Sequence, residues 1–326
     1  MDFFSHALLP YLLGNSSRLK KEDLTAFVVG GIAPDIDVFI IWVNLVYPNF
    51  FLITHRGITH SLFFGFFTGI VVLYLATRNR IKSTVRRYID FEPLITRRTV
   101  MFAYAGVVIH LFLDYVTTRG VPLYYPLSPL RHSAEVFFYT DIYLTILSLI
   151  IIIYLYKKPM QRKSTVKFLL VFLVVFAGLG SLRIEEKNSA EAFFSSAEIK
   201  TYPTMSPFDW YALEENSDTI KIYDYKGLER KSTHNQTFSR LNIMSSKDGL
   251  NSALDAAGEL PQIKMFKWGA YSVAVNASSN NGTWSLEYYD PLQRAMIRDA
   301  SSSFRRIARG FGSVNVTVKD GKAVIS

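Results

Sequence analysis

Cysteine is absent from the 326 residues of this chain. Disulfide bonds and thiolate zinc sites are therefore both excluded. A cleavable signal peptide is not expected either, because residues 1–13 lack a basic start and contain His6. The carboxy-terminal part of the chain has no group of potential catalytic residues, since His234 stands alone there. Any chemistry of this chain is therefore expected in its amino-terminal part.

Positive charge is concentrated in the same amino-terminal part. Residues 1–185 contain 19 basic and 11 acidic residues, which gives a net charge of +8. Residues 186–326 contain 17 basic and 16 acidic residues, which gives a net charge of +1. A nucleic-acid partner is not expected, because it would require a basic patch on a soluble domain. Basic clusters beside long apolar runs instead indicate the cytoplasmic side of membrane segments.

The apolar runs predict a mainly α architecture. We expect a polytopic helical membrane domain over residues 1–185, followed by a soluble, extracytoplasmic α+β domain over residues 186–326. The expected membrane spans are residues 61–77, 99–117, 135–156 and 166–182, and residues 38–53 are expected either to cross or to lie along the interface. The chain is therefore predicted to be a multi-pass protein of the cell membrane, with membrane lipid as a partner.

The carboxy-terminal part has the pattern of a small α+β domain. β-forming residues recur over residues 219–225, 270–277, 283–289 and 314–318, and Lys319-Asp320-Gly321-Lys322 is a typical hairpin turn before residues 323–325. An amphipathic helix is expected over residues 291–309, because Gly310 would end it.

Polar side chains in the apolar part gather around Thr54-His55-Arg56-Gly57-Ile58-Thr59-His60-Ser61, directly before the apolar run 62–76. Five of the six histidines of the chain precede residue 133. Histidine and arginine beside a membrane segment are costly unless something binds them, which favours a metal site. The alternative is that His55 and His60 only lie at the level of the lipid headgroups.

A histidine–aspartate pair and an aspartate pair add to this set. His110 and Asp114 are four residues apart, so they share one face of a helix. Asp35 and Asp37 share no helix face and can serve one site only in a turn or an extended geometry, which Pro34 favours. Imidazole and carboxylate together suit zinc, manganese or non-haem iron. Whether His132, Glu135 or Asp141 joins the site stays open, because Glu135 can favour the helix dipole and Asp141 can pair with a basic residue.

These segments together resemble a known family, the prokaryotic membrane-bound metal-dependent hydrolases, or YdjM-like inner-membrane proteins. The resemblance covers residues 1–155 and rests on Pro34-Asp35-Ile36-Asp37, on residues 55–61 and on the segment from His110 through Asp114 to Pro126. The family is similar to zinc-dependent phospholipase C, a helical fold with a multinuclear zinc site. The resemblance implies these metal ligands: His6, Asp35, Asp37, His55, His60, His110 and Asp114.

We therefore expect a membrane-embedded metal-dependent hydrolase that acts on a phosphoester or lipid-like substrate, such as a phospholipid, at the outer face of the membrane. Zinc is the expected ion, with manganese or iron as alternatives. Arg56 is expected to stabilise phosphoryl charge, or else to extend to the interface, and Asp37 to act as a base or to orient a ligand histidine. The alternative functions are divalent-cation binding or transport by the same cluster, and a structural metal site.

Overall fold

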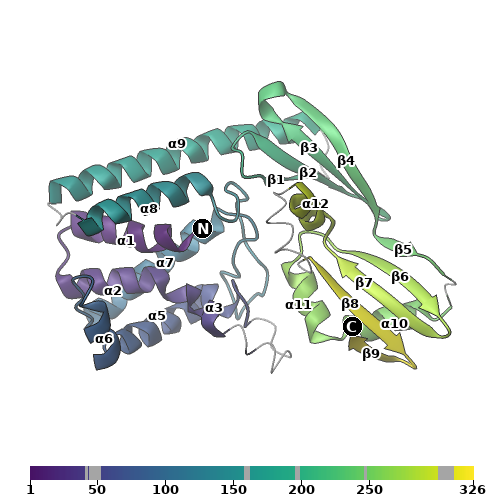
Figure 1. The fold of residues 1–326 in the computed structure, drawn as a ribbon, viewed down its shortest axis with the longest axis horizontal. Helices are drawn as coiled ribbons and strands as arrows, with labels where there is room; N and C mark the ends of the chain where they lie inside the picture. Colours follow the sequence, from purple (N-terminus) through teal and green to yellow (C-terminus); the bar gives the residue numbers. More distant parts are fainter. Residues whose placement is uncertain (41–42, 44–52, 158–161, 195–198, 246–247, 300–311) are drawn as a thin grey trace. The chain divides into compact units, whose positions relative to one another are not determined.

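The structure is a computed structural model that describes residues 1–40, 43, 53–157, 162–194, 199–245, 248–299 and 312–326 (Figure 1). The chain divides into two compact units, which are described separately. Unit 1 comprises Met1–Trp42, Ile53–Glu186 and Pro203–Pro207, and unit 2 contains Lys187–Tyr202 and Phe208–Ser326.

Unit 1 is helical. Its helices are α1 (Phe3–Ser16), α2 (Lys21–Ile32), α3 (Asp37–Ile40), α5 (Leu62–Ala76), α6 (Asn79–Val85), α7 (Arg97–Tyr115), α8 (Ile142–Lys157) and most of α9 (Arg162–Phe194). Two short 3-10 helices, η1 (Ala33–Ile36) and η2 (Ile58–His60), lie between them. The core joins Leu12 of α1, Leu113 of α7, Leu144 of α8 and Phe172 of α9, and all four side chains are fully buried. Burial of this apolar surface holds the helices side by side.

Glycines let α2 and α7 approach each other closely. A Cβ atom at Gly106 would lie 2.2 Å from the Phe27 carbonyl oxygen, and one at Gly30 would lie 1.8 Å from that of Ala103. Real Cβ atoms do not come this close, so neither position accepts a side chain unless the helix backbones separate. The packing of α2 on α7 fixes the distance between the end of α2 and the last turns of α7.

The prediction of a polytopic helical membrane domain is wrong. Among the described helices, only Lys163–Phe194 within α9 is long and apolar enough to cross a membrane, or two segments qualify if α5 and α6, bent by 79°, form one broken span. The helices α1, α2 and α8 have 14, 12 and 16 residues, below the roughly 20 that a membrane helix needs. The helix α7 has 19 residues but includes Arg97, Arg98, His110 and Asp114. The expected segment 38–53 lies mostly outside the described residues.

The helix expected to begin at residue 135 begins at Ile142. Glu135 has a φ of 51°, a left-handed conformation that a helix cannot contain. Asp141 instead caps α8, because its carboxylate accepts hydrogen bonds from the backbone N–H groups of Tyr143 and Leu144. Its other oxygen accepts a hydrogen bond from Arg183 Nη2 at 2.8 Å, within a fully buried ion pair. Asp141 therefore ties α8 to α9.

Unit 2 contains two sheets, so the chain as a whole is α+β and the expected mainly α class is wrong. The first sheet has the order β1 (Ile199–Pro203), β2 (Asp209–Glu215), β3 (Thr219–Lys226) and β4 (Lys231–Ser239). The second has the order β5 (Leu241–Ile243), β6 (Ala274–Asn280), β7 (Thr283–Tyr289), β8 (Ser313–Lys319) and β9 (Lys322–Ile325). The strands predicted over 219–225, 283–289 and 314–318 are confirmed.

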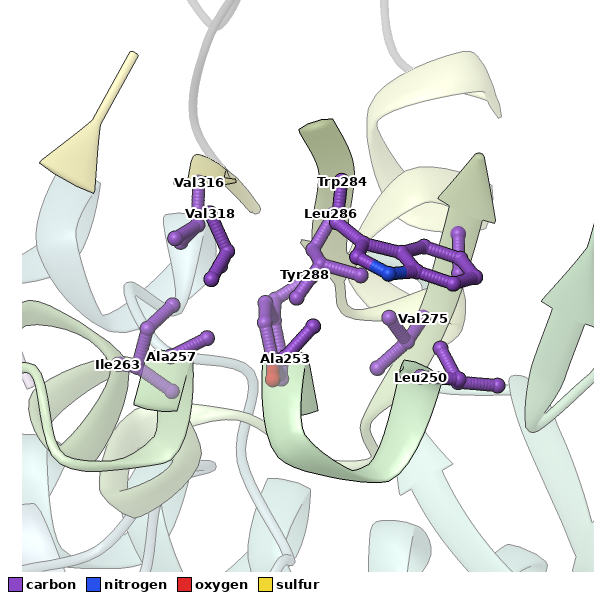
Figure 2. Close-up of a cluster of buried hydrophobic side chains, with 11 residues drawn as sticks. Leu250, Ala253, Ala257, Ile263, Val275, Trp284, Leu286, Tyr288, Val316 and Val318 are labelled. Atoms are coloured by element: carbon purple, nitrogen blue, oxygen red, sulfur yellow. The ribbon is translucent and has the colours of Figure 1, made fainter. Parts of the chain in front are cut away.

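The second sheet is covered by α10 (Leu250–Gly258) and α11 (Pro261–Gly269) (Figure 2). Trp284, Leu286 and Tyr288 of β7 point from one face of the sheet onto these helices, because alternate residues of a strand share a face. The predicted helix over 291–309 is present as α12 (Pro291–Asp299), and residues 300–311 lie outside the described residues.

The glycine packing leads to a stability prediction. Gly106→Ala should lower the free energy of unfolding by about 1–3 kcal/mol, because the new methyl group must force α2 away from α7. Gly178→Ala in α9 is the matched control, since nothing lies within 4 Å of its Cβ position. That change should leave stability unchanged or raise it by about 0.5–1 kcal/mol. Denaturant unfolding of the full chain in detergent measures both, and equal effects of the two substitutions would contradict the packing described here.

Candidate metal centre

The helix ends of unit 1 bring histidine and aspartate side chains into one cluster. His6 lies in the first turns of α1, Asp35 in η1, His60 at the end of η2, and His110 and Asp114 in the last turns of α7. These residues are far apart in the sequence and meet because α1, α2, α5 and α7 pack together. All seven residues predicted as metal ligands take part in the cluster.

Four atoms lie at the centre of the cluster, and they come from Asp35, His60, His110 and Asp114. His60 Nε2 and His110 Nε2 are 3.2 Å apart, and each lies 3.4 Å from Asp35 Oδ1. Asp114 Oδ2 is 3.5 Å from His60 Nε2 and 3.4 Å from His110 Nε2. An ion with tetrahedral bonds of 2.0–2.1 Å separates its ligand atoms by about 3.4 Å. The five distances are close to this value, and Asp35, His60 and His110 form one group with the spacing of metal ligands.

The His110 ring is oriented by the end of α2. Its Nδ1 lies 2.7 Å from the Gly31 carbonyl oxygen, which can only accept a hydrogen bond, so Nδ1 carries the proton. The lone pair of Nε2 is then left to face the cluster. Metal-ligating histidines are typically held in this way by a carbonyl or carboxylate behind the ring. The close approach of α2 to α7 makes this contact.

His6 and the second oxygen of Asp114 extend the cluster on one side. The His6 ring stacks on the His110 ring with 3.7 Å between centroids, and its Nε2 lies 3.3 Å from Asp114 Oδ1. Neither ring nitrogen of the buried His6 forms a hydrogen bond with another described residue. Buried polar atoms without partners are rare in native proteins, so an ion bound by His6, His110 and Asp114 fits this side.

Asp37 lies on the opposite side, between two histidines. Its Oδ1 is 2.9 Å from His55 Nδ1, and its Oδ2 is 3.1 Å from His60 Nδ1. Thr59 Oγ1 donates a hydrogen bond of 2.9 Å to the same Oδ2. Asp37, His55 and His60 form a third group with the spacing of metal ligands. The same contacts suit an alternative in which Asp37 orients His60, whose Nε2 faces the centre.

Arg56 is buried beside Asp114 and is 1% exposed. Its Nη2 lies 2.9 Å from Asp114 Oδ1, and its Nη1 donates a hydrogen bond of 2.8 Å to Thr117 Oγ1. The guanidinium also lies over the Tyr139 ring, 4.3 Å from its centroid. The amino group of Met1 contacts the same Asp114 oxygen. These contacts explain how a carboxylate that is 1% exposed keeps its charge.

The electrostatics of the cluster favour ionised carboxylates. Burial alone would raise the pKa of Asp114, but the Arg56 guanidinium and the Met1 amino group hold it well below its usual value. Burial would also lower the pKa of His60, yet hydrogen bonds to Asp35 and Asp37 raise it to about 9. Burial and the neighbouring His110 lower the pKa of His6 to about 3, so His6 is neutral and can act as a ligand.

Access to the cluster differs between its two sides. The side chains of His55 and Asp35 are 24% and 15% exposed, whereas those of His6, His60 and His110 are at most 1% exposed. The cluster therefore meets solvent at His55 and Asp35. The three ligand groups do not include His132, Glu135 or Asp141. His132 instead pairs through its backbone with Val121.

Several residues that support the cluster were not predicted. They are Gly31, Thr59, Thr117 and Tyr139. Thr59 lies within the segment 54–61, so its position between His55 and His60 could have indicated a place in the cluster. The contacts of Gly31 and Tyr139 depend on how distant segments pack, which no local pattern reveals.

Comparison with known proteins finds similarity to inner membrane proteins. The chain is 28% identical over 135 residues to the inner membrane protein YbcI of Escherichia coli (strain K12), a match that covers 40% of this chain and 70% of YbcI. No solved structure matches the chain. Residues 1–186 match the YdjM inner membrane protein family, and they contain the whole His/Asp cluster. The chain therefore belongs to the YdjM inner membrane protein family and is a protein of the cell membrane.

Proposed function

We propose that the chain is a metal-dependent hydrolase of the membrane that acts on a phosphoester, with a phospholipid as one candidate substrate. The observation that supports it best is the set of five distances of 3.2–3.5 Å among Asp35, His60, His110 and Asp114. Three carboxylates, those of Asp35, Asp37 and Asp114, lie in this cluster and supply anionic oxygen ligands for divalent cations beside the histidines. Zinc is the proposed ion, with manganese or iron as alternatives.

Divalent ions bound here would lower the pKa of a bound water and hold the oxygens of a phosphoester. The protein residues divide the remaining tasks. Asp37 and Thr59 orient His60, and the Gly31 carbonyl orients His110. Arg56 positions Asp114, because its guanidinium is buried against that carboxylate and against Tyr139. The catalytic roles expected for Arg56 and Asp37 stay predictions, and their contacts favour positioning roles.

Substrate would approach along the side of the cluster that is exposed, at His55 and Asp35. We also propose that this side faces away from the cytoplasm. The basic residues Lys157 and Lys163 stand just before and at the start of α9, and such residues are concentrated on the cytoplasmic side of membrane helices. The region that follows α9, from β1 onward, would then be extracytoplasmic. The outer end of α9 holds Arg183, which pairs with Asp141 at the start of α8.

Metal binding is the first test of this function. The full chain, purified in detergent and loaded with zinc or manganese, should bind at least one ion per chain. His110→Ala should weaken metal binding at least ~100-fold. Loss of a residue that only orients a ligand side chain already lowers metal affinity about 10–100-fold, and His110 is itself a proposed ligand. His132→Ala is the matched control, since His132 is outside the three ligand groups and should keep the metal. Elemental analysis and competition with a chelator measure both, and equal metal content in the two variants would remove the proposed centre.

Hydrolysis is the second test. In detergent micelles, the metal-loaded chain should release nitrophenol from bis(4-nitrophenyl) phosphate or from 4-nitrophenyl phosphorylcholine faster than from 4-nitrophenyl acetate. A chelator should abolish the release, and added zinc or manganese should restore it. His110→Ala should reduce the rate at least ~100-fold through loss of metal, whereas His132→Ala should leave it within a few-fold of wild type. Tight metal binding without turnover of any phosphoester would instead favour cation binding or transport, or a structural role for the metal.

A further inference from the structure

Unit 1 carries a second charged region, at the helix ends opposite the His/Asp cluster. The helix α5 begins just after His60 and ends just before Arg78. Similarly, α7 begins at Arg97 and has His110 in its last turns. The 19 residues of α7 correspond to a length of about 28 Å. The basic helix ends are therefore far from the candidate metal centre and form a separate region.

This region has an excess of positive charge. Residues 18–23 and 78–98 contain ten basic and four acidic residues. The four acidic residues do not balance the basic ones. The ion pairs formed here are Lys21–Asp90, Lys82–Glu92, Arg86–Glu92 and Arg98–Asp23. Arg80 and Arg87 are exposed, and neither forms an ion pair with another described residue. Their charges are available to an outside partner.

Exposed apolar side chains lie among these arginines. The helix α6 leaves α5 at an angle of 79°, and every residue of α6 is at least partly exposed. Ile81 in α6 is 43% exposed, and Tyr88 and Ile89, which follow it, are 67% and 53% exposed. We call Arg78, Arg80, Arg87, Ile81, Tyr88 and Ile89 together the basic surface.

An apolar stripe on α5 leads to the basic surface. Phe63, Phe67, Val71 and Tyr74 are each 48–54% exposed, and their spacing of three to four residues places them on one face of the helix. The stripe ends at Tyr74, whose hydroxyl accepts a hydrogen bond of 2.9 Å from Arg78 Nη1. Along α5, exposed apolar side chains are followed by arginine at the end of the helix. A lipid layer changes in the same order, from apolar acyl chains to charged headgroups.

The membrane helix α9 starts beside the same region. Asn15 Nδ2, at the end of α1, donates a hydrogen bond of 2.7 Å to Thr165 Oγ1 in the first turn of α9. The segment long and apolar enough to cross a membrane, Lys163–Phe194, begins in this first turn. If α9 crosses the membrane, the end of α1, which Arg18 and Lys20 follow, lies at headgroup level together with the start of α9.

We propose that the basic surface binds the phosphate-bearing headgroups of anionic phospholipids. Guanidinium groups bind phosphate through two parallel hydrogen bonds, and Arg80 and Arg87 have no competing carboxylate among the described residues. Ile81, Tyr88 and Ile89 add apolar contact with the lipid. A nucleic acid would bind the arginines but not the stripe of Phe63, Phe67 and Val71, so a lipid layer fits the whole surface better. This inference does not depend on the metal centre or on hydrolysis.

The test is a lipid titration of the full chain in a neutral detergent. Short-chain phosphatidylglycerol and phosphatidylcholine are added separately, and bound lipids are counted by native mass spectrometry. Each basic residue at an anionic lipid surface contributes about fivefold to affinity, so the double variant Arg80→Gln/Arg87→Gln should bind phosphatidylglycerol about 25-fold more weakly. The control Lys319→Gln/Lys322→Gln removes the same charge from the exposed turn between β8 and β9 and should bind like wild type.

We expect wild-type chain to bind phosphatidylglycerol at least tenfold more tightly than phosphatidylcholine, and expect added salt to weaken this preference. Equal binding of the two lipids, or equal loss in both double variants, would overturn the proposal. Tighter binding of a short DNA duplex than of phosphatidylglycerol would overturn it in favour of a nucleic-acid surface. Thermal melting and metal content of the two double variants should match wild type, which separates lost lipid binding from misfolding.

Discussion

The placement of three aspartates, two of them buried, among four histidines is the constraint on which the structure of unit 1 depends. Asp37 and Asp114 are at most 2% exposed, and carboxylates this deep in a protein must be paired. One guanidinium, that of Arg56, pairs directly with Asp114, and imidazoles surround the remaining carboxylate oxygens. The Nε2 atoms of His60 and His110 lie 3.2 Å apart and share carboxylate neighbours. A cation bound between them would stabilise this arrangement.

The packing of the helices serves this cluster. Glycine at positions 30 and 106 allows α2 and α7 to touch, and this contact brings the Gly31 carbonyl to His110. Each of α1, α5 and α7 has a cluster residue in or just before one end and arginine near the other. One helical unit thus holds the His/Asp cluster at one set of helix ends and a region of positive charge at the other.

Much of the cluster was predictable from the sequence, whereas the membrane architecture was not. His110 and Asp114 share a helix face by spacing alone. The turn or extended geometry expected around Pro34 is wrong, because Asp35 lies in the 3-10 helix η1 and Asp37 starts α3, yet both reach the cluster. The polytopic prediction failed because apolar composition does not reveal where helices begin and end. Asp141 caps α8, which begins only at Ile142, and the chain bends by 79° between α5 and α6. Thr117 and Tyr139, which contact Arg56, follow it in the sequence by 61 and 83 positions. Only tertiary packing brings such distant residues together.

X-ray absorption at the metal edge of the loaded full chain tests the metal centre most directly. We expect a first shell of nitrogen and oxygen atoms at about 2.0–2.1 Å with the scattering pattern of at least two imidazole rings, as His60 and His110 would supply. No sulfur shell is expected from cysteine, because the chain has none. A shell of oxygen atoms only, without imidazole scattering, would contradict a metal site built from these histidines.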